Sequence, residues 1–101
     1  MQPTVEETKI AYLRTGSKNV EITGEIIELN NIREVNTRYG ASKVVEALLQ
    51  DETGDIALVV WGELADKISE GDKVKVKKGY VSEWNGKLQL NTGRFGKLLI
   101  L

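Results

Sequence analysis

The fold is decided by residues 79–93, GYVSEWNGKLQLNTG. Apolar and polar residues alternate through 80–84 and again through 87–91, and Asn85-Gly86 separates the two runs. An Asn-Gly pair between alternating runs is the strongest short-range signal of a β-hairpin with a two-residue turn. The stretch therefore predicts two antiparallel strands joined by a tight turn.

The predicted hairpin carries aromatic side chains on its outer face. Successive side chains of a strand point to opposite faces, so Tyr80 and Trp84 point outward when Val81, Leu88 and Leu90 face a core. A tryptophan beside a hairpin tip, directed away from the core, favours a stacking platform for unpaired bases, because every base has an apolar face.

Composition limits the class of protein. With 101 residues and 41% hydrophobic residues, we expect residues 1–101 to form a single domain, with residues 1–18 as an N-terminal capping segment. The absence of Cys and His excludes disulfides, zinc sites built from thiolate or imidazole, and catalysis by either side chain. We expect no metal and no cofactor.

Hydropathy gives no sign of a membrane span or of a signal peptide. No apolar run approaches the roughly 18 residues that a spanning helix needs, and the first residues lack the basic and apolar regions of a secretory signal. We expect a soluble, cytoplasmic, nucleoid-associated monomer.

Charge is unevenly distributed. The net charge of −1 by itself argues against nucleic-acid binding, but residues 73–97 contain seven basic residues and one acidic residue. This excess can make one face positive in a slightly acidic protein. For Lys73, Lys75 and Lys77 the alternative is an ordinary solvated strand with alternating lysines.

The pattern before the hairpin predicts three further strands and one helix. Gly24 interrupts the alternation of the first strand and suggests a bulge or a sharp bend. The inward phase of Val74 and Val76 does not match that of Val81, which predicts a bulge near Lys78-Gly79. The predicted elements are a strand at 19–29 that continues, bent, through Ile32 and Val35, a loop at 37–42, strands at 43–50 and 55–61 around a turn at 51–54, and a helix at 63–70 ended by Gly71.

Five strands with one short helix between the third and fourth match the OB-fold, an all-β Greek-key barrel with small α content. This barrel binds oligonucleotides across strands two and three, between the loops that join strands one to two and four to five. A sandwich and an SH3-like barrel are the alternatives, and neither accounts as simply for the helix.

Residues 50–62, 68–72 and 79–93 together resemble the single-stranded DNA-binding proteins of archaea and the related OB domains of replication protein A. The resemblance covers roughly residues 16–97. In the archaeal single-domain members three aromatics stack on bases, which implies the same role for Trp61, Tyr80 and Trp84. At the last two positions the crenarchaeal members carry other aromatics.

Other side chains are candidates for phosphate or base contacts. A sequence-tolerant binder needs rings for the bases and cations for the phosphates. Trp61 has the alternative of lying covered under a loop or the N-terminal segment. Tyr39 either clamps a base or lies on the barrel wall, and Phe95 either stacks or plugs the barrel. The polar candidates are Arg33, Arg38, Lys43, Lys87, Gln89, Asn91 and Arg94.

We therefore expect single-stranded DNA binding with little sequence preference, in DNA replication or repair. One alternative is an assembly module of a replication protein A-like complex, which would use the aromatic face or the apolar residues 98–101 against a partner chain. Another is RNA or tRNA binding. The carboxylates at 51–55 lack the spacing of a calcium loop and fit a hairpin turn. An enzyme is not expected, because the chain lacks a phosphate-binding glycine loop and because Glu63 and Asp66 have no base or nucleophile nearby.

Overall fold

Strands make up most of the chain. The structure, a computed structural model, describes residues 6–38, 40–92 and 97–101, with side chains from residue 8 onward. Its elements are β1 (Glu6–Glu7), the 3-10 helix η1 (Ile10–Tyr12), β2 (Lys18–Leu29), β3 (Arg33–Thr37), β4 (Gly40–Asp51), β5 (Gly54–Trp61), the 3-10 helix η2 (Gly62–Asp66), β6 (Lys73–Trp84), β7 (Lys87–Asn91) and β8 (Lys97–Ile100).

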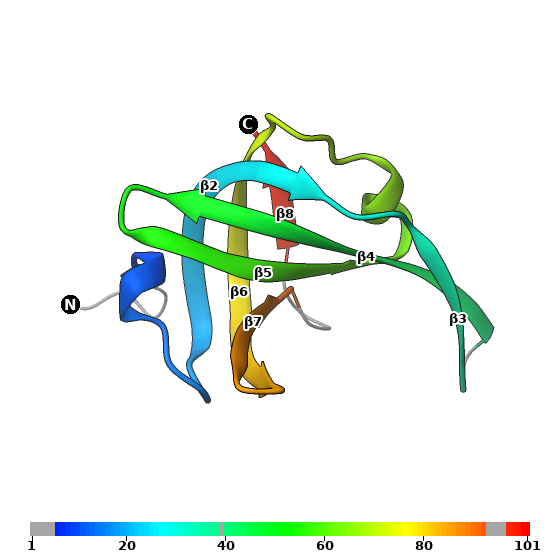
Figure 1. The fold of residues 1–101 in the computed structure, drawn as a ribbon, viewed down its shortest axis with the longest axis horizontal. Coiled ribbons are helices and arrows are strands. Elements are labelled where there is room, and N and C mark those ends of the chain that lie inside the picture. Colours follow the sequence, from blue (N-terminus) through cyan, green and yellow to red (C-terminus); the bar gives the residue numbers. More distant parts are fainter. Residues whose placement is uncertain (1–5, 39, 93–96) are drawn as a thin grey trace.

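Five of these strands close into a barrel (Figure 1). Antiparallel pairs join β2 to β4, β4 to β5 and β7 to β6, and a parallel pair joins β5 to β7. The first half of β2 pairs with β6 and completes the ring. The predicted five-stranded OB-fold is confirmed. Strands β1, β3 and β8 extend the sheet from β2, β4 and β6.

Alternate residues of the barrel strands form the core. Ile22, Leu49, Leu58 and Leu90 are fully buried, one from each of four strands. From η1, Ile10 joins the same buried cluster. The period-two pattern of the sequence thus selects the inward residues correctly.

Gly24 lies where β2 passes from β6 to β4. Its neighbour Glu25 pairs with Lys73 of β6 and with Gln50 of β4. A Cβ at Gly24 would lie 2.7 Å from the Gln50 carbonyl oxygen, so a side chain does not fit there. Of the two alternatives that the sequence suggests at Gly24, the bulge is not found, because the register between β2 and β4 shifts further along, after Ile26. The passage of β2 from β6 to β4 at this point fits the sharp bend.

Two local predictions about β6 and β7 are confirmed. The register of β6 against β2 shifts between Val76 and Gly79, and Lys78 has a φ of +55°, so a bulge reverses the phase of the strand. Asn85 and Gly86 have φ of +53° and +78°, as a two-residue hairpin turn requires. These two features direct Tyr80, Ser82 and Trp84 outward.

The helix prediction is correct in position and wrong in type and length. The element is a 3-10 helix that ends at Asp66. Ser69 and Asp72 then form a turn, in which the Ser69 N–H donates to the Asp72 carboxylate.

Within the described residues, no helix is long and apolar enough to cross a membrane.

The region between the first two barrel strands also differs from prediction. The first strand does not continue through Ile32, which is exposed; β3 is a separate strand that pairs with β4. The predicted loop at 37–42 is a tight hairpin turn, because Thr37 already pairs with Gly40. Together β3 and the start of β4 form a two-stranded arm that projects from the barrel (Figure 1).

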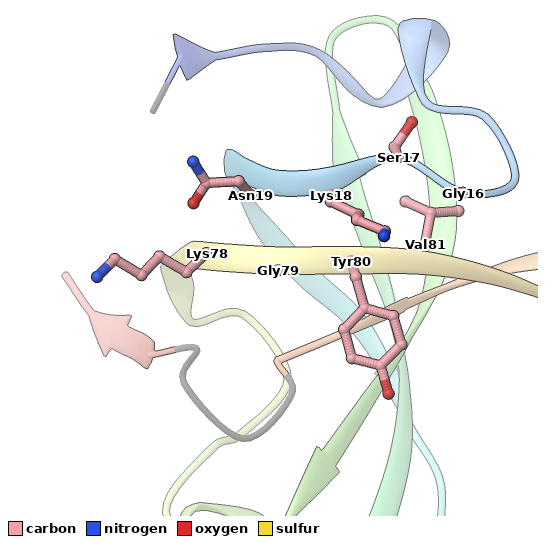
Figure 2. Close-up of a pocket in the computed structure, with 8 residues that line it drawn as sticks. All are labelled: Gly16, Ser17, Lys18, Asn19, Lys78, Gly79, Tyr80 and Val81. Carbon is pink, nitrogen blue, oxygen red and sulfur yellow. The ribbon is translucent and has the colours of Figure 1, made fainter. Parts of the chain in front are cut away.

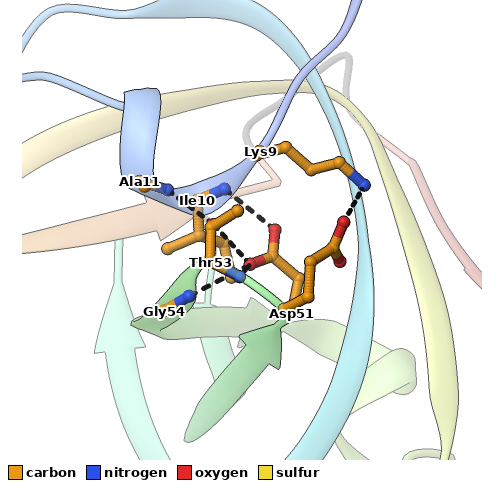
Figure 3. Close-up of polar contacts among 7 residues, drawn as sticks. Lys9, Ile10, Ala11, Asp51, Thr53 and Gly54 are labelled. Atoms are coloured by element: carbon orange, nitrogen blue, oxygen red, sulfur yellow. Dashed lines mark hydrogen bonds and ion pairs between the residues drawn. The ribbon is translucent and has the colours of Figure 1, made fainter.

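Hydrogen bonds to the Asp51 side chain link η1 to the β4–β5 turn (Figure 3). Its carboxylate accepts hydrogen bonds from the Ile10 N–H at 2.9 Å, the Thr53 hydroxyl at 2.6 Å, the Thr53 N–H at 2.7 Å and the Gly54 N–H at 3.2 Å. The Thr53 hydroxyl oxygen accepts from the Ala11 N–H at 3.0 Å. An exposed ion pair, Lys9 with Glu52 at 2.7 Å, lies beside this network.

These hydrogen bonds shift the pKa of Asp51. Partial burial alone would raise the pKa of the carboxyl, but the bonds from Thr53, Ile10 and Gly54 outweigh it and lower the pKa below its usual value. The Asp51 carboxylate therefore stabilises the fold above the unfolded-state pKa of about 4, and this contribution is lost as the pH falls through the lower folded-state pKa.

We expect Asp51→Asn to lower the free energy of unfolding at neutral pH by about 1–3 kcal/mol, because the new amide group faces backbone donors that it cannot satisfy. Urea denaturation followed by tryptophan fluorescence measures the change. Because Asn does not titrate, the stability of the variant should also fall less steeply below about pH 4 than that of the wild-type protein.

Glu52→Gln is the matched control for this measurement. It removes one carboxylate from the same turn, but its ion pair with Lys9 is exposed, so its effect should be much smaller. Equal losses in the two variants would contradict the role assigned to Asp51.

Candidate nucleic-acid interface

A groove of about 330 Å³ lies between the arm and the β6–β7 hairpin. In Figure 1 both hairpins point downward, the arm at the right and the β6–β7 hairpin at the centre, and β5 runs above the β6–β7 hairpin toward the arm. The floor belongs to β4 and β5, and the walls to β3 on one side and to β6 and β7 on the other. The groove is lined by Arg33, Val35, Val44, Glu46, Val59, Trp61, Trp84 and Gln89.

Trp61 stands at the end of β5 with 45% of its surface exposed. It pairs with Val44, and alternation along β5 directs it outward together with Val59, while Leu58 and Val60 are buried. The alternative that a loop covers Trp61 is therefore wrong in this structure.

Trp84 is the most exposed of the three predicted stacking residues, at 65%. It pairs with Lys87 across the Asn85-Gly86 turn, so the turn holds the ring at the tip of the hairpin. Trp61 and Trp84 line the same groove from its floor and its wall.

Tyr80 is also exposed, at 44%, but it lines a different pocket of about 410 Å³. It lies four residues before Trp84 on the same face of β6, which is a distance of about 13 Å along a strand. Its cross-strand neighbour is Lys18 of β2, and Figure 2 shows the two side chains on adjacent strands. Lys18 was not predicted as a site residue.

The predicted cations fall into different places. Arg33 lines the groove, Arg38 is exposed in the turn of the arm, and Lys87 is exposed opposite Trp84. Arg94 lies outside the described residues, as do Tyr39 and Phe95.

Lys43 is directed away from the groove. Its chain neighbour Val44 lines the groove, so Lys43 points to the opposite face of the arm, where its ammonium lies 2.7 Å from the Asp66 carboxylate. The hydrogen bond to Asp66, the charge of that carboxylate and, more weakly, the charge of Glu34 raise the pKa of Lys43. The position of Lys43 does not fit the phosphate contact that the sequence suggests.

The two polar candidates of β7 also differ from each other. The Gln89 amide lies in the groove and donates to the Glu46 carboxylate at 3.4 Å. Asn91, by contrast, is buried, and its amide donates to the Ser82 hydroxyl at 3.1 Å and to the Gln89 carbonyl at 3.4 Å. Asn91 therefore shares the outer face with Tyr80 and Ser82, as expected, but it is not open to a ligand, because it is only 9% exposed and its amide is engaged within the hairpin.

The lysine-rich start of β6 lies away from the aromatic groove. Lys75 forms an ion pair with Glu21 of β2 at 3.6 Å, and β8 pairs with this part of β6. These lysines precede the bulge at Lys78, whereas Trp84, the β6 residue that lines the groove, follows it. The alternative of a solvated strand describes them better than a phosphate-binding face.

Glu46 is the groove residue that sequence reasoning missed. It is the one acidic residue between 43 and 50, and its position two residues after Val44 places it on the outer face of β4. That interruption of an apolar strand was the available signal.

Among the described residues, no group of His, Cys, Asp or Glu side chains is arranged to hold a metal ion.

Comparison with known proteins agrees with this fold. A family model described as an OB-fold nucleic acid binding domain matches residues 20–98. The chain is 33% identical over 92 residues to the single-stranded DNA binding protein Ssb of Saccharolobus solfataricus, across 91% of this chain and 62% of that protein. It is 27% identical over 93 residues to Replication factor A of Methanothermobacter thermautotrophicus, across 91% of this chain and 12% of that protein.

A solved structure gives the same result. The crystal structure of a domain of replication protein A from Methanococcus maripaludis matches with a TM-score of 0.75 and 26% identity, across 94% of this chain and 97% of that domain. The two sequence relatives are longer than this chain, which spans 62% and 12% of their lengths.

We expect Trp84→Ala to change the free energy of unfolding by less than about 0.5 kcal/mol, because the exposed ring contributes little to the core. Leu90→Ala, in the adjacent strand, should cost about 2–5 kcal/mol, because Leu90 is fully buried. Urea denaturation followed by circular dichroism measures both. A loss of several kcal/mol in Trp84→Ala would show that the ring is structural.

Proposed function

This chain belongs to the family of OB-fold nucleic acid binding domains, and from that premise we propose that it binds single-stranded DNA with little sequence preference, in DNA replication or repair. The observation that carries the proposal is the pair of exposed tryptophans, Trp61 and Trp84, on one groove.

The energetics of these rings support the proposal. Burying a large apolar side chain stabilises a protein by about 1.5–3 kcal/mol, and here two tryptophans on the same groove are left 45% and 65% exposed. Stacking an unpaired base on such a ring contributes about 1–3 kcal/mol. The faces of bases in a duplex are already stacked on each other, so the groove favours single strands.

Cations near the groove supply contacts for the phosphate chain. Arg33 lies on the wall formed by the arm, and Lys87 lies opposite Trp84 at the tip of the hairpin. A strand that follows the outer face of β6 from Trp84 reaches Tyr80 after about 13 Å, where Lys18 is the neighbouring cation. We propose Tyr80 as a further stacking residue on this path.

Names of relatives are consistent with this function. One relative is named a single-stranded DNA binding protein and another Replication factor A. Stacking does not distinguish ribose from deoxyribose, so RNA is the competing ligand. Competition between oligo-dT and oligo-U ranks the two.

Oligo-dT should quench the tryptophan fluorescence of the wild-type protein, and a dT·dA duplex of equal length should do so much less. Trp61→Ala and Trp84→Ala should each weaken binding by about fivefold to 150-fold, the equivalent of one lost stack. The remaining tryptophan reports binding in each variant. Tyr12→Ala is the matched control, since Tyr12 is 71% exposed on η1 and does not line the groove.

Equal binding of the duplex, or no quenching by either ligand, would contradict the proposal. Oligomerisation that depends on protein concentration, without any response to nucleic acid, would instead support the assembly module. Exposed Leu99 and Ile100 of β8 are the surface that such an assembly would use.

Salt should weaken binding, because neutralised phosphates release counterions. Replacing Arg33 or Lys87 by Gln should reduce the slope of log K against log salt by about 0.7 per lost phosphate contact. Lys43→Gln is the control, because Lys43 lies on the opposite face of the arm and pairs with Asp66. A slope that falls equally in all three variants would show a general charge effect and contradict the assigned contacts.

A further inference from the structure

The floor of the groove carries an acidic side chain. Glu46 is half-buried and lines the groove together with Val44 and Val59. It also lines the adjoining cavity of about 540 Å³, which Lys87 lines as well. Glu46 therefore borders both the groove of the tryptophans and the cavity beside Lys87.

Gln89 is held against this carboxylate. Its amide nitrogen donates to the Glu46 carboxylate at 3.4 Å, across β5, where Val59 pairs with Glu46 and Ala57 with Gln89. This bond uses one of the two N–H groups of the Gln89 amide and leaves its side-chain oxygen able to accept from a ligand. A carboxylate has only acceptor atoms. The polar atoms of the floor are thus predominantly hydrogen-bond acceptors.

Such a floor repels phosphate and attracts donors. The cations that attract phosphate lie at the sides, with Arg33 on the arm and Lys87 beyond the hairpin turn. Bases that stack on Trp61 or Trp84 therefore direct their edges, rather than the phosphate chain, toward Glu46. The edge of each base then determines how well it fits.

We infer that Glu46, with Gln89, gives this groove a preference for bases that carry an exocyclic amino group, and so for cytosine over uracil or thymine. The N4 amino group of cytosine donates to a carboxylate, whereas uracil and thymine present the O4 acceptor at the same place. This inference rests on the proposed single-stranded DNA binding and refines it. The preference is modest beside the stacking energy, which all bases share.

The test compares oligo-dC with oligo-dU of equal length, at mildly alkaline pH where cytosine is unprotonated. Both are pyrimidines that differ in the exocyclic group at C4 and in the proton at N3, so their stacking areas are closely matched. We expect the wild-type protein to bind oligo-dC about fivefold to tenfold more tightly in the fluorescence titration. In Glu46→Gln the ratio should fall below about twofold, mainly because oligo-dU binds more tightly.

Glu25→Gln is the matched control. It removes the same charge from an exposed position of β2 that lines a different pocket with Lys73. It should strengthen binding of both oligonucleotides slightly and leave their ratio unchanged. Circular dichroism melting verifies that each variant is folded, and the wild-type ratio tests the inference without any variant.

The outcomes separate the two claims. Equal binding of oligo-dC and oligo-dU by the wild-type protein, or a preference for oligo-dU, would overturn the inference and leave single-stranded binding intact. An unchanged ratio in folded Glu46→Gln would overturn the role of Glu46. If neither oligonucleotide quenched the tryptophans, the proposed function would fail and the inference with it.

Discussion

The closure of the barrel by β2 is the constraint on which the rest of the structure depends. One strand must pair with β6 along its first half and with β4 along its second, and the two sets of backbone hydrogen bonds meet near Glu25. The crossing is possible because Gly24 presents no side chain to the Gln50 carbonyl. Closure satisfies the backbone of five strands without open edges in the barrel, and it fixes which faces of β4, β5, β6 and β7 point outward.

Features governed by neighbouring residues were predictable from sequence. The Asn85-Gly86 turn, the phase reversal at Lys78 and the outward direction of Trp61 and Trp84 follow from alternation and turn chemistry alone. Features governed by distant residues were not. The arm separates from β2 because β3 pairs with β4, and the partner of Lys43 is a residue of η2. Asn91 lies on the outer face, as alternation predicts, but it is buried there and bonded to Ser82 of the neighbouring strand.

The same distinction applies to the candidate site. Residue type and alternation along a strand identify the exposed aromatic residues. Only the folded chain shows that Trp61 and Trp84 line one groove while Tyr80 lines another pocket. Likewise, a charge count over residues 73–97 suggests a basic face, yet much of that charge lies beyond the bulge from the groove. Local sequence composition therefore overstates the positive charge of the groove, whose lining includes Arg33 of β3 but none of the lysines at 73–78.

The arm has a topological consequence for any ligand of the groove. Its outer strand, β3, is mostly exposed and is held to the barrel through β4, its sheet partner. The groove is thus open along its side rather than a closed ring around its contents. A ligand that lies in it needs no free end, because it can enter and leave from the side.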